Sequence, residues 1–224
     1  MIYAIVKRVF DILFSGIALL MLSPLFIPIS IVLLFTGEGY VFYLQERVGF
    51  KNRLFKIYKF ATMLKDSPNM PGGIITVKND PRLTPLGSFL RKTKINELPQ
   101  LINILIGDMS FVGPRPLMKT SYNVYPESVR NDIYSVKPGL TGIGSIIFRD
   151  EESLLSKINE NGDDVWSFYS LKVYPYKGVV EKWYRENKGF ITDLLCLFIT
   201  FWVVPFPESN IIYRIFPSLP VRPF

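Results

Sequence analysis

Apolar residues run without a single charged side chain from Ile12 to Phe35. The run is longer than the roughly 20 residues that cross a bilayer as a helix, so it predicts a membrane helix. It is too long for a signal peptide, and no small-residue cleavage pattern follows it. Ser23, Pro24 and Pro28 lie inside it, and because proline removes a backbone donor, we expect a kink near the middle.

Basic residues lie on both sides of this segment. Lys7 and Arg8 precede it, and a longer basic set follows it: Arg47, Lys51, Arg53, Lys56, Lys59 and Lys65. Positive residues favour the cytoplasmic side of a membrane. A helix that enters the bilayer, breaks at Ser23-Pro24 and returns to the same face therefore fits both flanks better than a simple span. The simple span and a buried hairpin of a soluble protein stay open as alternatives.

The next part of the chain has the pattern of strands followed by a loop. Val41 to Phe60 is rich in β-branched and aromatic residues around a turn at Gly49 to Arg53, which predicts a β-hairpin. Ser67 to Asp80 is rich in proline, glycine and asparagine and predicts a loop.

Two helices are predicted after this loop, Leu86 to Lys94 and Leu98 to Ile106, and they meet at a corner, Asn96-Glu97. Asn is a favoured N-cap and Glu suits the positive end of a helix, so the corner predicts the start of the second helix. The apolar stripe of that helix comprises Leu98, Leu101, Ile102, Leu105 and Ile106. Taken alone, the corner is explained by capping without chemistry.

The C-terminal part predicts surface elements. Leu194 to Val204 is an apolar run too short to span and contains Trp202, which is typical of an interfacial helix. Residues 205–224 are rich in proline and predict an extended tail on the domain or on lipid.

The predicted fold is α+β and mainly helical. It is a membrane-associated (monotopic) domain with an N-terminal re-entrant helix, a short β-hairpin and interfacial amphipathic helices. We expect the re-entrant membrane helix at residues 1–38, a cytoplasmic membrane-interface domain at 39–204 and the tail at 205–224.

Composition narrows the chemistry. The 224 residues carry 26 Lys plus Arg against 19 Asp plus Glu, a net charge of +7, which suits a partner rich in phosphate. There is no histidine, which removes the usual general base, the Ser-His and Cys-His nucleophile systems and most zinc sites. Chemistry must then rely on carboxylates, lysines, a tyrosine or a hard ion such as Mg²⁺. The single cysteine, Cys196, excludes an internal disulfide, and its apolar surroundings predict a buried thiol.

Two segments are candidates for phosphate binding. Arg115 lies between Pro114 and Pro116, whose fixed φ angles would present its guanidinium on rigid backbone. A solvated arginine in a polyproline turn is the alternative. Val136 to Ser145 contains glycines and Lys137, so its backbone N–H groups could approach an anion, although a plain loop fits equally well. No DNA-binding motif occurs, and we expect no nucleic-acid partner.

Several blocks along the chain, in order, resemble the bacterial sugar transferase family of monotopic polyprenyl-phosphate phosphoglycosyl transferases. They are Lys7–Asp11, Leu22–Pro24, Phe55–Phe60, Leu90–Thr93, Glu97–Gln100, Gly107–Ser110, Gly113–Pro116 and Lys137–Gly142. The resemblance implies an enzyme at the cytoplasmic face of the bacterial inner membrane. It would move a sugar-1-phosphate from a UDP-sugar to undecaprenyl phosphate, with Mg²⁺, and release UMP as the first step of surface glycan synthesis.

The resemblance also assigns roles to residues. In the family an Asp-Glu pair occupies the positions of Asn96-Glu97; the Asp attacks the phosphate of the nucleotide sugar to form a covalent intermediate, and the Glu helps to hold Mg²⁺. Here we assign Glu97 to Mg²⁺, Arg91 and Arg115 to phosphate, and Lys59 to charge stabilisation. Asn96 cannot form an acyl phosphate, so we assign it to orientation by hydrogen bonding.

This chain departs from the family in two further places. Ala61 replaces the usual Arg, and Ile143 to Asp150 replaces a segment that contains Gln. One hypothesis is an active transferase with an altered mechanism, in which another carboxylate (Asp150, Glu151 or Glu152) or direct attack by the lipid phosphate replaces the missing nucleophile. The other is an inactive pseudoenzyme that serves as a membrane-bound binding or scaffold partner in glycan assembly. The donor sugar and the oligomeric state, including a homodimer, stay open.

Overall fold

The computed structural model describes residues 2–36, 38–67, 69–70, 80–206 and 208–224, with the side chain of Glu152 left out. Within them the α-helices are α1 (Ile2–Phe35), α2 (Pro85–Lys92), α3 (Gln100–Ile106), α4 (Lys119–Val124), α5 (Glu127–Ile133), α6 (Ile143–Ile147), α7 (Glu151–Glu160), α8 (Val165–Phe168), α9 (Tyr174–Asn187), α10 (Phe190–Val203) and α11 (Ile211–Ile215). Shorter helical turns are η1 (Phe50–Asn52), η2 (Ile95–Glu97) and the π-helical turn η3 (Tyr169–Val173). Of the loop expected from Ser67 to Asp80, residues 68 and 71–79 lie outside the described part of the chain.

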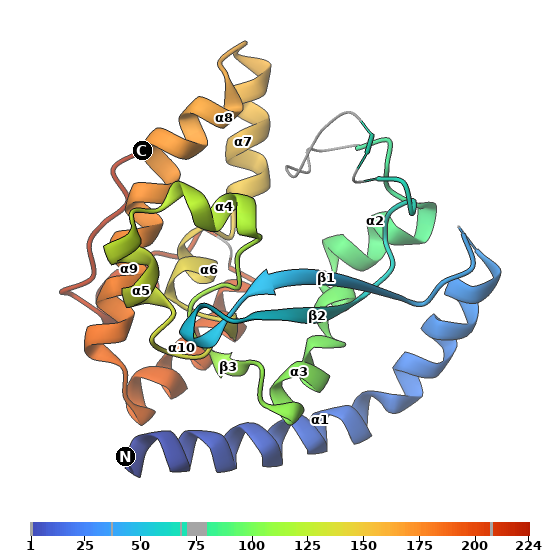
Figure 1. Ribbon diagram of the computed structural model, residues 1–224, viewed down its shortest axis with the longest axis horizontal. Helices are drawn as coiled ribbons and strands as arrows, with labels where there is room; N and C mark the ends of the chain where they lie inside the picture. Colours follow the sequence, from blue (N-terminus) through green and yellow to red (C-terminus); the bar gives the residue numbers. More distant parts are fainter. Residues whose placement is uncertain (1, 37, 68, 71–79, 207) are drawn as a thin grey trace.

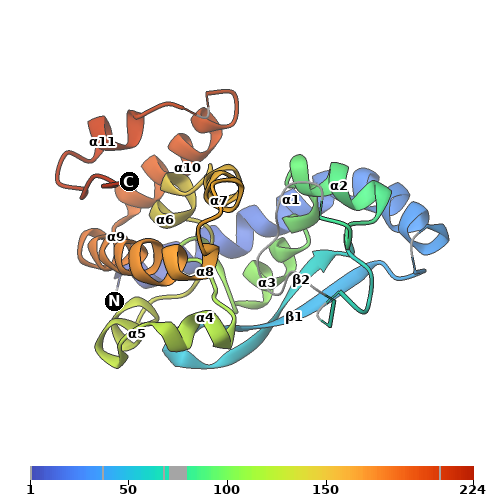
Figure 2. The ribbon, with the colours of Figure 1, turned by 90° about the horizontal axis from the view of Figure 1, so that it is seen from above.

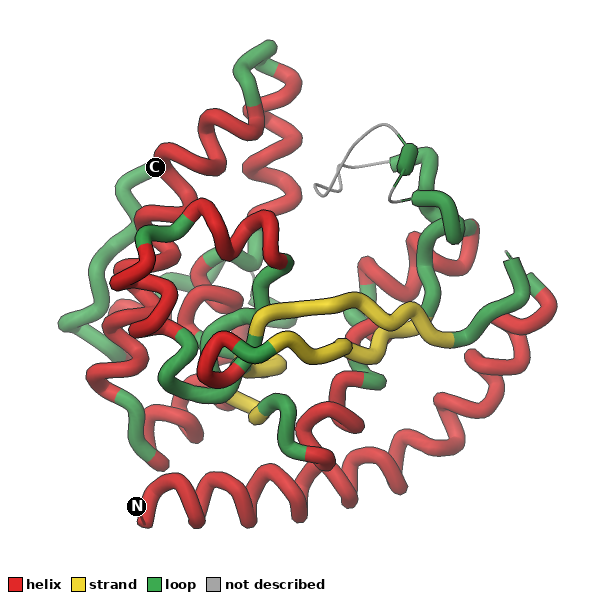
Figure 3. The backbone as a smooth tube through the Cα atoms, viewed as in Figure 1, coloured by secondary structure: helices red, strands yellow, loops and turns green. Residues whose placement is uncertain are grey.

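Strands are few, as Figure 3 shows. β1 (Phe42–Val48) pairs antiparallel with β2 (Leu54–Phe60), which confirms the predicted hairpin, and β3 (Ser110–Val112) pairs parallel with β4 (Gly139–Thr141). Figure 2 shows α9, α10 and α11 gathered at one end with α6 and α7, and α2 with the second half of α1 at the other. The main cluster of buried apolar residues joins α6, α9, α10 and α11. The fold is therefore α+β and rich in helix.

Helix α1 is long and apolar enough to cross a membrane by length and composition. Most of its large apolar side chains are exposed, which indicates contact with lipid rather than with a protein core. Pro24 and Pro28 lie inside the helix, which continues through them and bends upward beyond its middle in Figure 1. The hydroxyl of Ser23 donates to the carbonyl of Leu20 at 2.8 Å. That carbonyl is the one that Pro24, lacking an N–H, leaves without its helical partner.

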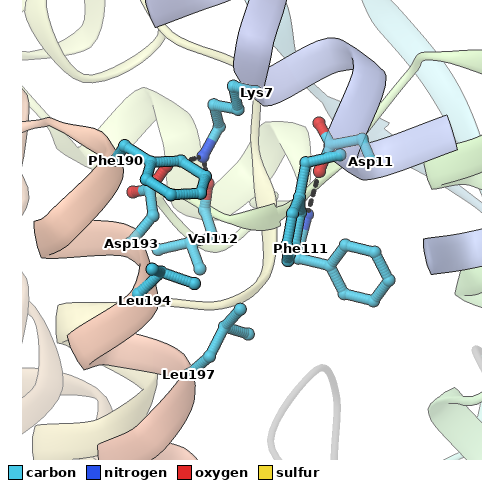
Figure 4. Close-up of a pocket in the computed structure, with 9 residues that line it drawn as sticks. Lys7, Asp11, Phe111, Val112, Phe190, Asp193, Leu194 and Leu197 are labelled. Atoms are coloured by element: carbon cyan, nitrogen blue, oxygen red, sulfur yellow. Dashed lines mark hydrogen bonds and ion pairs between the residues drawn. The ribbon is translucent and has the colours of Figure 1, made fainter. Parts of the chain in front are cut away.

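The first turns of α1 are fixed to the rest of the protein (Figure 4). Lys7 donates to the carboxylate of Asp193 on α10 at 2.5 Å and to the carbonyl of Val112 at 2.9 Å. Asp11 is 2% exposed and accepts from Ser110 at 3.0 Å and from the N–H of Phe111 at 3.1 Å. The free-energy cost of removing these charged groups from water is offset because each is paired or hydrogen-bonded.

Arg8 extends this attachment to helix α3. Its guanidinium donates to the carbonyls of Ile104 at 2.7 Å and of Leu105 at 2.8 Å, in the last turn of α3. Those carbonyls lack helical partners, and a cation is favourable at that end of a helix. The basic pair Lys7-Arg8 therefore locks the start of α1 onto the globular part.

Two sequence predictions about this corner and helix α3 were wrong, one about where the helix begins and one about its apolar stripe. The corner does not start a helix with Asn96 as N-cap: Asn96 lies in η2, and α3 begins at Gln100 after Pro99. The cause is Lys94, whose left-handed backbone (φ 61°) ends the preceding segment and turns the chain into a separate 3₁₀ turn. In α3 the buried apolar residues are Leu101 and Ile104, whereas Ile106, expected in the apolar stripe, is 59% exposed.

The C-terminal end follows its prediction in part. The interfacial run lies in α10, where Cys196 and Ile199 are buried while Phe201 and Trp202 are exposed. The expected extended tail at 205–224 was wrong for Ile211–Ile215, which forms α11. Its apolar residues reach the main buried cluster, and this packing stabilises a turn of helix that composition alone did not indicate.

Candidate active site

The turn η2 places Glu97 against the face of the β1–β2 hairpin that carries Lys59. Side chains of alternate residues point to the same face of a strand, and the register pairs Tyr43 with Lys59 and Arg47 with Phe55. Lys59 and Arg47 therefore share one hairpin face. Asn103 on α3 fixes the strand beside them, since its amide accepts from the N–H of Tyr58 at 2.9 Å and donates to a strand carbonyl.

Glu97 is held between two cations from distant parts of the chain. Its Oε1 accepts from Lys59 Nζ at 3.3 Å and from Arg115 Nη2 at 3.2 Å. Burial alone would raise the pKa of Glu97, but the charges of Lys59, Arg115 and Lys94 outweigh it and hold that pKa well below its usual value. Glu97 is thus a carboxylate at any physiological pH.

The two cations respond differently to this environment. Burial lowers the pKa of Lys59 to about 8, since Glu97 only partly offsets the loss of water and the charges of Arg115 and Arg47 repel it. Glu97 raises the pKa of Arg115 against the effect of burial. The site therefore contains a lysine that can lose its charge near neutral pH beside an arginine that keeps it.

The backbone of Arg115 is held on both sides. Tyr134 donates its hydroxyl to the carbonyl of Arg115 at 3.1 Å and accepts from the N–H of Leu117 at 3.1 Å. The buried carboxylate of Glu181 on α9 accepts from the N–H groups of Arg115 and Gly144. A guanidinium carried on such fixed backbone loses little freedom when it binds an anion.

The glycine-rich segment after Lys137 serves close packing. A Cβ on Gly139 would lie 2.1 Å from the nitrogen of Gly113, and one on Gly142 would lie 2.1 Å from the oxygen of Gly113. Glycines are needed here because β3 and β4 bring backbone against backbone. The structure therefore favours the plain structural interpretation of this segment over an anion loop.

The structure does not bring every sequence candidate together. Arg91 lies on α2, where its charge acts on the carboxylate of Asp80. Asn96 is 5% exposed, and its Oδ1 is buried without a hydrogen-bond partner among the described residues. Ser23 and Pro24 lie in α1, in the membrane helix and not in this site.

Comparison with known proteins identifies the family. The sequence pattern of the bacterial sugar transferases matches residues 2–206. The chain belongs to that family. It is 34% identical over 189 residues to the exopolysaccharide production protein ExoY of Rhizobium meliloti. The matched region covers 77% of this chain and 83% of that protein.

Two longer relatives carry descriptive names. The undecaprenyl-phosphate galactose phosphotransferase of Salmonella typhimurium is 34% identical over 88% of this chain and 40% of its own length. The UDP-N-acetylgalactosamine-undecaprenyl-phosphate N-acetylgalactosaminephosphotransferase of Aeromonas hydrophila is 38% identical over 65% of this chain and 35% of its own. This sugar transferase thus spans well under half of each of these two relatives.

The carboxylates considered as substitutes for a nucleophile in this sugar transferase are engaged elsewhere. Asp150 pairs with Arg222 through contacts of 2.6 and 2.7 Å. Both oxygens of Glu151 accept from Lys177 at 2.9 Å, and Tyr169 donates to the same carboxylate. The side chain of Glu152 lies outside the described part of the structure. Each of the two described carboxylates is thus held in an ion pair away from Glu97.

One residue of the site was missed by sequence reasoning. Arg47 was considered only as part of the basic flank of the membrane segment, yet its guanidinium donates to the carbonyl of Pro116 at 3.3 Å, beside Arg115. The sequence showed that Tyr43, Gln45 and Arg47 alternate along the strand, and the register of the structure places them on the same face as Lys59. Only the hairpin register reveals that this face is the one turned to Glu97.

Proposed function

We propose that this sugar transferase moves a sugar-1-phosphate from a UDP-sugar to undecaprenyl phosphate at the cytoplasmic face of the membrane and releases UMP. The observation that carries the proposal is Glu97 held between Lys59 and Arg115. Family membership and the names of the relatives from Salmonella and Aeromonas support it. Phosphoryl transfer depends mainly on positioning and neutralising charge, which such a cluster supplies.

The mechanism proposed is a single displacement. An oxygen of the lipid phosphate attacks the phosphorus that bears the sugar; a new P–O bond forms, the bond to the bridging oxygen breaks, and UMP departs with that electron pair. Asn96 has no carboxylate to form an intermediate, and Asp150 and Glu151 are tied in ion pairs. Arg115 and Lys59 hold the phosphate oxygens and stabilise the charge that develops on them.

Mg²⁺ fits the site as an ion shared with the substrate. Among the described residues no group of three or more Asp, Glu, His or Cys could hold a metal by itself. Mg²⁺ commonly uses one or two carboxylates together with substrate phosphates. Both hydrogen bonds to Glu97 arrive at Oε1, and Glu97 would be the protein ligand. When bound, the ion would neutralise charge on the diphosphate.

The membrane geometry is part of the proposal. We propose that α1 enters the cytoplasmic leaflet and returns to the same face, with the bend at Ser23-Pro24 at its deepest point. The exposed apolar side chains of α1 and of α10, including Phe201, support contact with lipid. The attachment of Lys7 to Asp193 would keep the active site next to the headgroups, where the acceptor phosphate lies.

The second candidate function is a pseudoenzyme that binds ligand without turnover and acts as a scaffold in glycan assembly. The amide at position 96 and the ion pairs of the neighbouring carboxylates favour it. Release of UMP separates the two candidates. The purified protein in nanodiscs, with undecaprenyl phosphate, Mg²⁺ and a panel of UDP-sugars, should release UMP with at least one of them; ligand binding without release across the panel would favour the pseudoenzyme.

A pH profile tests the role of Lys59. Because its pKa is lowered to about 8, the free protein loses this positive charge as pH rises through that value. We expect kcat/KM to fall about tenfold for each unit above pH 8, as for one required proton. Lys59→Arg keeps its charge, so its fall should move to higher pH. An identical profile in wild type and Lys59→Arg would exclude Lys59 as the titrating group.

A further inference from the structure

The charges that meet at the site do not balance. Lys59, Arg47 and Arg115 act on one another electrostatically, and Glu97 is the carboxylate that acts on all three. Glu151 also acts on Arg115, but it is itself paired with Lys177 at 2.9 Å. Three positive charges thus share the one negative charge of Glu97. Lys59 and Arg115 both pair with Glu97, so one negative charge faces three positive ones, and Arg47 is the cation that forms no ion pair with it.

Arg47 is placed beside Arg115 by the fold. The end of β1 pairs with the segment after Arg115, where the N–H of Val48 donates to the carbonyl of Leu117 at 2.8 Å. The guanidinium of Arg47 donates to the carbonyl of Pro116 at 3.3 Å and from Nε to Gln45 Oε1 at 3.1 Å. Strand β1 and the Pro114–Pro116 segment therefore place Arg47 next to Arg115.

The partners of Arg47 orient it without neutralising it. Gln45 and Pro116 offer neutral oxygens, and no ion pair to Arg47 is formed within the described part of the chain. Burial and the charge of Arg115 together lower the pKa of Arg47 to about 10, although the charge of Glu97 acts in the opposite direction. A half-buried arginine beside a second cation is unfavourable in the absence of an anion. An anion bound between the two would relieve that repulsion.

We propose that Arg47 and Arg115 together form a second phosphate subsite, next to the phosphate position at Lys59. Two guanidinium forks give planar sets of donors that match phosphate oxygens. The inference rests on the proposed function, because a single displacement requires the diphosphate of the donor and the phosphate of the acceptor to be bound together. Phosphate oxygens are the shared chemistry, and either the nucleotide diphosphate or the lipid phosphate can supply them.

Binding of soluble and lipid probes tests the subsite without requiring turnover. UDP is titrated into the full chain in nanodiscs, and the melting temperature is compared in nanodiscs with and without undecaprenyl phosphate. Arg47→Gln should weaken one of these two interactions at least tenfold or abolish its shift. Arg53→Gln is the matched control, because Arg53 is an exposed arginine in the turn of the same hairpin and should leave both interactions unchanged.

The outcomes identify the source of the phosphate and separate this inference from the proposed function. Loss of UDP affinity assigns the subsite to the donor, and loss of the lipid-dependent shift assigns it to the acceptor. Normal binding of both probes by Arg47→Gln overturns the subsite even if the wild type releases UMP. Arg47-dependent binding in a wild type that releases no UMP overturns the proposed function and keeps the subsite. Absence of both interactions in the wild type overturns both.

A second substitution guards against a folding defect in Arg47→Gln. Arg47→Lys keeps the charge and the aliphatic stem but loses the fork of donors. We expect it to bind the affected probe more tightly than Arg47→Gln and more weakly than wild type. Equal affinity of Arg47→Lys and wild type would show that a point charge suffices and would overturn the arginine-pair geometry.

Discussion

Glu97→Gln is expected to lower the kcat of UMP release by about a thousandfold, the upper range for removal of one group that stabilises a transition state. Glutamine keeps the size and the hydrogen-bonding oxygen of the side chain, so contacts with Lys59 and Arg115 at 3.3 and 3.2 Å can persist. What disappears is the negative charge that balances these cations and that would hold Mg²⁺. The measurement is kcat and KM at saturating lipid, with UMP as the product detected.

The split between kcat and KM makes this result specific. Without the carboxylate, the cations around position 97 have no counterion from this residue, so affinity for the anionic donor should be kept or increased while kcat falls. Glu160→Gln, at an exposed position at the end of α7, removes the same charge away from the site and should behave as wild type. A kcat within tenfold of wild type in Glu97→Gln would remove Glu97 from the mechanism.

Local patterns predicted the elements that depend on local forces. The uncharged run ending at Phe35 is helical, and the β-branched and aromatic stretch from Val41 to Phe60 is a hairpin, because period and length settle both. The three candidate residues Glu97, Lys59 and Arg115 also lie together, although they are far apart in sequence. Spacing alone could not show this; the family resemblance supplied it.

The failures arise where the backbone conformation of a neighbour or a tertiary contact overrides local preference. Asn96 has the chemistry of an N-cap, but the left-handed conformation of Lys94 places it in a separate turn with a buried side chain. Helix α11 exists because Ile212 and Phe216 pack into the main buried cluster, which a proline-rich sequence does not reveal. Arg47 looked like one more basic residue near the membrane until the register with β2 fixed its face. Prediction of α11 and of the position of Arg47 would have required knowledge of partners distant in the chain.

Asn96→Asp is expected to change the order of events at the site. Position 96 is 5% exposed and adjoins Glu97, on which the charges of Lys59, Arg115 and Lys94 act. These cations would keep an aspartate at position 96 ionised despite burial. The buried Oδ1 of Asn96 has no hydrogen-bond partner among the described residues, so the substitution breaks no hydrogen bond to that oxygen.

The wild type should release UMP only when undecaprenyl phosphate is present, because an amide cannot take the sugar phosphate. In Asn96→Asp a carboxylate oxygen can attack the sugar-bearing phosphorus, form an acyl phosphate and expel UMP before any acceptor binds. We therefore expect a burst of about one UMP per protein in the absence of lipid. Rapid quenching of Asn96→Asp mixed with UDP-sugar and Mg²⁺ measures it, and intact-protein mass should rise by one sugar phosphate.

Two comparisons decide what this burst means for the wild type. Asn159→Asp, an exposed change of the same chemistry on α7, should give no burst. If the wild type itself shows a burst without lipid, a nucleophile other than position 96 exists and the single displacement is wrong. If Asn96→Asp gains both the burst and steady turnover while the wild type only binds ligand, the chain is a pseudoenzyme, because its phosphate-binding groups are competent and only the carboxylate at position 96 is missing.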